Sequence, residues 1–257
     1  MSPLHLDHQA LWRRHVAVGA QTLQVNSGKI AAMARPQKVK LKALVFDAYG
    51  TLFDVHSVVR LCDELWPGQG TALSQLWRAK QLEYTWQRSL MRRYKDFADV
   101  TVDGLRYACA ALGLSLSESQ ETRLREAYLS LTTFPEVKDA LGQLSQLQLA
   151  ILSNGAPSML DPVVANAGLR GVFSAVISVD PLNTYKPTPD VYQLAVKRLG
   201  VPKNEIGFVS SNCWDACGAK SFGLRTFWIN RSDAPVDRLD AAPDHVIRNL
   251  AELPDLV

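Results

Sequence analysis

Two kinds of apolar pattern alternate along most of the chain. Short continuous apolar runs predict strands buried on both faces, and stretches in which apolar residues recur every three or four positions predict amphipathic helices. The predicted strands are 41–47, 148–152, 175–178, 206–210 and 225–229. The helices predicted between the later strands are 157–167, 188–199 and 214–222, and Pro135 is typical of the first turn of another. Strands that alternate with helices indicate an α/β fold, a doubly wound parallel sheet of Rossmann-like type.

The region between the first two predicted strands has only the helical pattern. Capping residues and breakers divide it into four predicted helices. These run from Ser57 to the Trp66-Pro67-Gly68 break, from Thr71 to Tyr94, from Thr101 to Gly113, and from a Ser117/Gln120 capping box to about Leu131. We therefore expect a core domain formed by 41–56 and 132–257, with an inserted four-helix cap domain at 57–131.

Residues 1–40 do not continue either pattern. Arg13-Arg14 precedes a weakly apolar stretch, and Ala32-Met33-Ala34 is similar to a signal cleavage site, as in twin-arginine export signals. Polar residues interrupt the continuous apolar segment that a signal needs, namely His15, Gln21, Gln24, Asn26 and Lys29. We predict a poorly ordered extension, or a true start at Met33, on a cytoplasmic protein, with export as the minor alternative.

Composition excludes several classes of protein. The 257 residues include 28 Lys+Arg and 25 Asp+Glu, and a net charge of +3 is too small to indicate nucleic acid or an anionic membrane as partner. No apolar run approaches the about 18–20 residues that span a bilayer. The cysteines lack the paired Cys-x-x-Cys units of a structural zinc site, so we expect reduced thiols and no metal. They are Cys62, Cys109, Cys213 and Cys217.

Chemically reactive side chains follow successive predicted strands. Asp47 ends the first strand, Ser153 follows the second, Lys186 follows a longer loop after the third, and Ser210 and Asp215 follow the fourth. Any one of them has an ordinary explanation as a turn or cap residue. Because the carboxyl ends of parallel strands meet at one edge of a sheet, these residues together predict an active site there.

These residues lie in strings that resemble the haloacid dehalogenase superfamily, whose first signature is an apolar strand followed by Asp-x-x-x-Thr, here Asp47 to Thr51. Over roughly residues 40–250 the chain is most similar to the type II (S)-2-haloacid dehalogenases. The strings that carry the resemblance are 45–57, 77–86, 151–155, 185–187 and 209–215. The resemblance implies a small-molecule 2-haloacid substrate, a covalent aspartyl ester, no cofactor and a homodimer.

Two positions favour a dehalogenase over the phosphatases of the same superfamily. Phosphatases keep an acid two residues after the nucleophile to protonate the leaving group, and Tyr49 stands there with a phenol whose ordinary pKa is about 10. Ser211 replaces one carboxylate of the pair that would hold Mg²⁺. Halide leaves as a stable anion and needs no proton. A Mg²⁺-dependent phosphatase and a catalytically silent binding module are the alternatives, and the module would be expected to lack Asp47 or Lys186.

A mechanism follows from these residue types. Asp47 attacks the α-carbon and displaces halide, and Lys186 keeps its carboxylate ionised. Asp215, oriented by Ser210, Asn212 and Lys186, activates the water that hydrolyses the ester. The resemblance implies these predicted catalytic residues: Asp47, Thr51, Arg78, Ser153, Lys186, Tyr192, Ser210, Asn212 and Asp215. The predicted substrate-binding residues are Ala48, Tyr49, Arg78, Leu82, Phe97, Ser153, Asn154 and Trp214.

Arg78 is the predicted contribution of the cap domain. Residue type alone favours a solvent-exposed arginine, as at Arg88 and Arg92 nearby, but the resemblance implies that Arg78 accepts the departing halide. Leu82 lies one helical turn from Arg78 on the same face. With Phe97, Tyr49 and Trp214 it is expected to wall an apolar pocket that excludes water. Ala79 departs from the family pattern and leaves the preferred substrate size open.

Overall fold

A computed structural model of the chain describes residues 38–257. The predicted extension, the twin-arginine pattern and the alternative start at Met33 lie outside the described residues. Within the described part of the chain, no helix is both long enough and apolar enough to cross a membrane.

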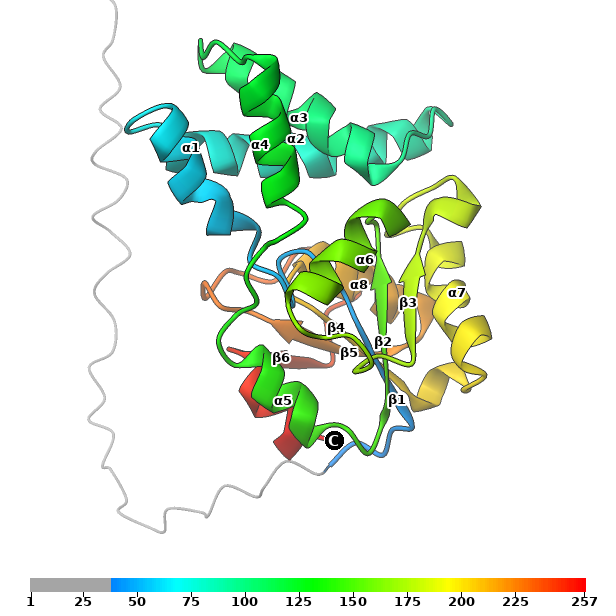
Figure 1. Cartoon of the computed structure of the whole chain (residues 1–257). Coiled ribbons are helices and arrows are strands. Elements are labelled where there is room, and N and C mark those ends of the chain that lie inside the picture. Colours follow the sequence, from blue (N-terminus) through cyan, green and yellow to red (C-terminus); the bar gives the residue numbers. More distant parts are fainter. Residues whose placement is uncertain (1–37) are drawn as a thin grey trace, which may run out of the picture. The chain divides into compact units, whose positions relative to one another are not determined.

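A parallel sheet of six strands forms the core, as Figure 1 shows. The strand order is β3-β2-β1-β4-β5-β6, so β2 and β3 lie on one side of β1 and β4, β5 and β6 lie on the other. The strands are β1 Ala43–Phe46, β2 Gln148–Ser153, β3 Ala175–Ser178, β4 Ile206–Ser210, β5 Arg225–Ile229 and β6 His245–Ile247. All four residues of the central strand β1 are fully buried, which explains its continuous apolar run. The predicted doubly wound parallel sheet is confirmed, and its order reverses between β1 and β4, where such sheets bind ligands.

The sequence pattern missed β6. This strand has three residues and pairs in parallel with β5 at the edge of the sheet. Asp244 precedes it and accepts hydrogen bonds from the Thr226 N–H, at 2.9 Å, and the Lys220 ammonium. A run this short carries no detectable periodicity, so contacts with β5 define it.

The core helices begin and end with the expected chemistry. They are α5 Val137–Gln143, α6 Pro157–Asn166, α7 Pro189–Leu199 and α8 Cys213–Phe222. α6 and α7 start with proline, and α7 and α8 end at glycines in the left-handed conformation, Gly200 and Gly223. The prediction that Pro135 lies in a first helical turn is wrong: Pro135 lies in the turn before α5, whose N-cap is Glu136.

Four α-helices lie between β1 and α5 and are grouped beside the sheet (Figure 1). They are α1 Val59–Leu65, α2 Gly70–Leu90, α3 Phe97–Ala111 and α4 Glu118–Ala127. The Ser117/Gln120 capping box of α4 is present, and α2 and α4 end at Leu90 and Ala127, earlier than the predicted Tyr94 and Leu131. The long α2 packs along α3.

Two predicted helix starts are wrong for the same reason. Ser57 lies in a short 3₁₀ turn, Val55–Val58, which is capped by Asp54 and precedes α1. Thr101 lies buried inside α3, which begins at Phe97 and is capped by the Asp96 side chain, an acceptor from the Asp99 N–H at 2.9 Å. Asp54 caps the 3₁₀ turn before α1 and Asp96 caps α3, and aspartate caps at least as well as serine or threonine.

Candidate active site

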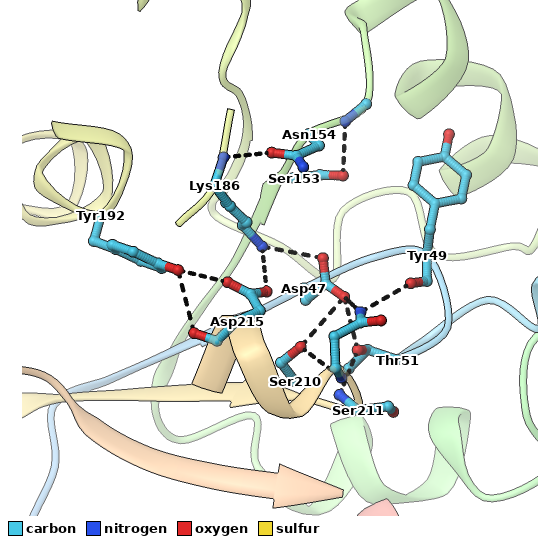
Figure 2. Close-up of polar contacts among 12 residues, drawn as sticks. Asp47, Tyr49, Thr51, Ser153, Asn154, Lys186, Tyr192, Ser210, Ser211 and Asp215 are labelled. Atoms are coloured by element: carbon cyan, nitrogen blue, oxygen red, sulfur yellow. Dashed lines mark hydrogen bonds and ion pairs between the residues drawn. The ribbon is translucent and has the colours of Figure 1, made fainter. Parts of the chain in front are cut away.

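Strand ends bring the predicted polar residues together (Figure 2). Asp47 follows β1, and its N–H donates to the Val209 carbonyl of β4 at 2.9 Å, which extends the strand pairing into the site. Ser153 and Ser210 are the last residues of β2 and β4, and Asp215 lies in the first turn of α8. All of these side chains are buried, and Asp47 is 6% exposed. The site therefore lies where the strand order reverses.

The two oxygens of the Asp47 carboxylate have different surroundings. Among the described residues, Oδ1 accepts one hydrogen bond, from the Lys186 ammonium at 3.0 Å. Oδ2 accepts from the Thr51 hydroxyl and the Asn212 amide, both at 2.9 Å, and lies 3.5 Å from the Ser210 hydroxyl. The donors on Oδ2 hold the orientation of the carboxylate, and Oδ1 keeps lone-pair density free.

Lys186 links the two carboxylates of the site. Its ammonium lies 3.0 Å from Asp47 and 2.8 Å from Asp215, and all three groups are buried. Burial lowers the pKa of Lys186, but the charges of Asp215 and Asp47 outweigh it and the pKa is raised, which keeps the amine protonated.

Asp215 is held from both sides. The Tyr192 hydroxyl donates to its Oδ1 at 2.8 Å, while Lys186 binds Oδ2. Burial and the charge of Asp47 raise the pKa of Asp215 to about 6, against the lowering effect of Lys186. A carboxylate with such a pKa is a general base suited to neutral pH.

The loop after β2 supplies hydrogen-bond donors. The Ser153 hydroxyl oxygen accepts the Gly155 N–H at 3.0 Å, and the Asn154 side-chain oxygen Oδ1 accepts the Lys186 backbone N–H at 3.0 Å. Among residues 38–257 no acceptor binds the Ser153 proton or the Asn154 NH₂ group, so both can donate to an anion. A Cβ atom on Gly155 would lie 2.7 Å from the Tyr49 ring, so glycine allows that ring to lie close to the strand end.

Arg78 reaches the site from α2. Its Nη2 donates to the Tyr49 carbonyl at 3.1 Å, in the loop after Asp47, and its Nη1 donates to Gln81 Oε1 at 2.6 Å. Partial burial lowers the pKa of Arg78. Arg88, on the same helix, instead forms an ion pair with Asp103 at 2.8 Å. Of these two partly buried arginines, Arg78 is therefore the one that contacts the loop after Asp47.

The four side chains predicted to surround an apolar pocket lie in two separate places. Leu82 and Trp214 line a cavity of about 490 Å³, together with Arg78 and Asn212. Tyr49 and Phe97 instead pack on each other, with ring centroids 5.6 Å apart. Tyr49 and Phe97 do not line this cavity, because they are buried against each other. Their assignment to the substrate pocket stays a prediction.

Tyr128 and Arg231 were missed by the sequence analysis. Tyr128, after α4, lies beside Tyr49 with ring centroids 6.4 Å apart. Arg231 donates to the Ser211 hydroxyl at 2.7 Å and to Glu136 at 2.8 Å, and its guanidinium stacks on Phe134. Arg231 follows the predicted strand 225–229, so the strand-end criterion could have found it.

Carboxylates are sparse around the site. Among residues 38–257, no group of three or more His, Cys, Asp or Glu side chains is arranged to hold a metal ion. The Lys186 ammonium lies between Asp47 and Asp215, where a cation would otherwise be attracted.

Comparison with known proteins agrees with this geometry. Residues 41–223 match the haloacid dehalogenase-like hydrolase family. An (S)-2-haloacid dehalogenase of Pseudomonas putida is 51% identical, over 83% of this chain and 95% of the relative. A solved L-2-haloacid dehalogenase is 50% identical, covers 84% of this chain and 97% of its own, and has a TM-score of 0.82. The L-2-haloacid dehalogenase of Xanthobacter autotrophicus with chloropropionic acid covalently bound is 44% identical, with coverages of 84% and 98% and a TM-score of 0.79. The chain belongs to the haloacid dehalogenase-like hydrolases.

Proposed function

We propose that this chain hydrolyses (S)-2-haloalkanoic acids to (R)-2-hydroxyalkanoic acids and halide. The observation that carries the proposal is the Asp47 carboxylate, held on Oδ2 and open on Oδ1, with the Arg78 guanidinium bound to the adjacent loop. This arrangement pairs a buried nucleophile with an anion acceptor. The relatives named (S)-2-haloacid dehalogenase support the same substrate class.

In the first step, Asp47 Oδ1 forms a bond to C2 of the haloacid as the carbon–halogen bond breaks. Attack from the side opposite the halogen inverts the carbon, and the halide takes the bonding electron pair toward Arg78. The Ser153 hydroxyl, the Asn154 amide and the N–H groups of Ala48 and Tyr49 bind the substrate carboxylate. No proton is transferred in this step.

In the second step, water attacks the ester carbonyl carbon of Asp47. Asp215 accepts a proton from this water, and its pKa of about 6 makes that transfer effective near neutral pH. The bond between the ester oxygen and the Asp47 carbonyl carbon then breaks, and the departing hydroxyacid oxygen, which belonged to Asp47, takes the proton from Asp215. The second proton of the water is released to solvent as the Asp47 carboxylate re-forms. Thr51, Ser210 and Asn212 hold the reacting group, while Lys186 and Tyr192 hold Asp215.

The phosphatase alternative lacks two groups it would need. Burial raises the pKa of Tyr49, so its phenol is a poor acid for an alkoxide leaving group. Ser211 occupies the position where a phosphatase would have a metal-binding carboxylate. Its hydroxyl accepts a hydrogen bond from the Arg231 guanidinium at 2.7 Å. Halide leaves without a proton and without a metal ion, so the step that breaks the carbon–halogen bond needs neither group.

The proposal includes a division of labour between two domains. The core, 41–56 and 132–257, supplies Asp47, Lys186 and Asp215, and the cap, 57–131, supplies Arg78. The resemblance also suggests a homodimer in the cytoplasm. Light scattering on the purified chain measures the oligomeric state, and fractionation of the cells that make it measures its location.

Halide release from (S)- and (R)-2-chloropropionate in the presence of EDTA tests the function. We expect chloride and (R)-lactate from the (S) substrate, no reaction with the (R) substrate, and no effect of EDTA. p-Nitrophenyl phosphate should be hydrolysed negligibly. Strong Mg²⁺-stimulated phosphate release, with no release of halide, would overturn the proposal.

A further inference from the structure

The guanidinium of Arg78 is held by a buried amide on its own helix. Gln81 is fully buried one helical turn after Arg78, and its Oε1 accepts from Arg78 Nη1 at 2.6 Å. Its Nε2 donates to the Thr101 hydroxyl of α3, also at 2.6 Å. A continuous line of hydrogen bonds therefore runs from α3 through Gln81 to Arg78.

Thr101 determines which way the Gln81 amide faces. The Thr101 hydroxyl has one proton, which it donates to the Phe97 carbonyl at 2.6 Å. Toward Gln81 it has only lone pairs, so that neighbour must be the NH₂ end of the amide. A flipped amide would place NH₂ against the Arg78 guanidinium, donor against donor, and would leave two buried groups unpaired. The carbonyl oxygen of Gln81 is thus directed to Arg78.

Close helix packing locates Thr101 beside Gln81. A Cβ atom on Gly104 of α3 would lie 3.2 Å from the Gln81 backbone nitrogen, so glycine permits the approach. The Trp77 indole N–H donates to the Thr101 carbonyl at 2.7 Å. Trp77 and Gln81, on one face of α2, therefore both bind Thr101 of α3: Trp77 binds its backbone carbonyl and Gln81 binds its hydroxyl.

We propose that Gln81, oriented by Thr101, is a positioning residue that holds the Arg78 guanidinium at the departing halide without neutralising its charge. This inference rests on the proposed dehalogenase function. A carboxylate at position 81 would form an ion pair with Arg78 and compete with the halide. An apolar side chain at position 81 could not accept this hydrogen bond, and the long Arg78 side chain would then occupy many rotamers. The neutral amide supplies orientation and leaves the positive charge for the leaving group.

Four variants test the proposal in the full chain. Gln81→Met removes the acceptor with similar volume, and Gln81→Glu adds the competing charge. Thr101→Val removes the hydroxyl that orients the amide, whereas Thr101→Ser retains it. Thr85→Val is the matched control, because Thr85 is also buried and its hydroxyl donates within α2, to the Leu82 carbonyl at 2.6 Å.

Single-turnover halide release from (S)-2-chloropropionate and (S)-2-bromopropionate, with enzyme in excess, reports the step that Arg78 assists. We expect Gln81→Met, Gln81→Glu and Thr101→Val to slow chloride release by about 10²-fold, a typical cost of a misplaced catalytic group. Bromide is the better leaving group and needs less stabilisation, so its release should slow much less. Thr101→Ser and Thr85→Val should retain most of the wild-type rate with both substrates.

Chloride binding to the resting protein gives a second readout, measured by broadening of the chloride NMR signal. Thr101→Val and Gln81→Glu should weaken it, and Thr85→Val should not. Wild-type rates and wild-type chloride binding in the Gln81 variants and in Thr101→Val would overturn the proposal. Equal slowing of chloride and bromide release would also overturn it, because it would indicate general structural damage. A wild-type chain inert toward both haloacids would instead overturn the dehalogenase function, and the chloride titration would still decide the role of Gln81 and Thr101.

Discussion

At the scale of single residues, the unequal oxygens of Asp47 define what the site can do. Oδ2 carries the hydrogen bonds of Thr51 and Asn212, and Oδ1 carries, within residues 38–257, only that of Lys186. A carboxylate used as a general base would serve equally well with either oxygen bound. A nucleophile needs one oxygen with a lone pair available to approach carbon, and Oδ1, bound among the described residues by Lys186 alone, meets that need.

Labelling distinguishes these two roles of Asp47. With enzyme in excess in H₂¹⁸O, the first turnover should label the peptide that contains Asp47 and leave the product lactate unlabelled, because water attacks the ester carbonyl. Mass spectrometry of both species measures this. Asp47→Asn should be inactive. Label in first-turnover lactate, with none in the Asp47 peptide, would make Asp47 a base at most.

Arg78 should not tolerate lysine. The guanidinium donates to both the Tyr49 carbonyl and Gln81, and a compact ammonium cannot reproduce this fork. We expect Arg78→Lys to lower kcat on 2-chloropropionate by about 10²-fold or more, the cost of one preorganised electrostatic donor. Arg88→Lys, on the same helix but paired with Asp103, is the control and should stay close to wild type. Equal activities of the two variants would argue against the assigned role of Arg78.

At the scale of elements, the helices α1–α4 carry both a contact with the loop after Asp47 and purely structural features. α2 delivers Arg78 and Gln81, whereas the capping box at the start of α4 is exposed. Local rules predicted this capping box correctly because both partners lie within one helical turn. They failed at α3, where Asp96 rather than Thr101 is the cap. Thr101 is an interior residue bonded to Gln81, and that contact is invisible to local rules.

The capping box of α4 can be removed without affecting the site. Ser117 accepts the Gln120 N–H, and the Gln120 side chain accepts the Ser117 N–H. Ser117→Ala should lower the free energy of unfolding by about 1 kcal/mol, the typical value of an N-cap, and leave kcat unchanged. Urea denaturation measures the stability, with Ser145→Ala at an exposed turn as control. A matching loss of activity would mean that α4 is coupled to the site.

At the scale of the whole molecule, the buried charges of the site lower the free energy of unfolding. Asp47 and Asp215 share one ammonium, so the three groups carry a net negative charge away from water. Such an arrangement costs folding free energy and persists where function requires it. The surrounding fold, whose central strand is fully buried, compensates for this cost.

Stability should therefore depend on pH through Asp215. Its pKa in the folded chain, about 6, lies above the ordinary value of 3.8, so the folded state binds more protons between these values. The wild type should lose stability as pH rises from about 4 to about 6, by on the order of 1–3 kcal/mol. Asp215→Asn removes this dependence. The melting temperature of Asp215→Asn minus that of the wild type should be larger at pH 8 than at pH 4. The variant itself should be inactive. A difference that does not change with pH would contradict the pKa assigned to Asp215.

Sequence alone determined the architecture and the main chemistry of the site. Alternating apolar runs predict a parallel sheet, and the carboxyl ends of parallel strands meet at one edge, so Asp47, Ser153, Ser210 and Asp215 could be grouped from their positions along the chain. Each strand, and the polar residue that follows it, is recognised from residues close together in the chain. The same local reasoning could not find β6, which is too short to carry a pattern.

Only the tertiary structure decided which arginine enters the site and how it is held. Arg78 and Arg88 lie on one helix and have the same chemistry, but of the two it is Arg78 that contacts the loop after Asp47. The Thr101 hydroxyl that orients Gln81 and the Arg231 guanidinium on Ser211 are likewise contacts between distant parts of the chain. Periodicity shows that a side chain is buried. The partner that it meets depends on how helices and strands pack, which no local pattern encodes.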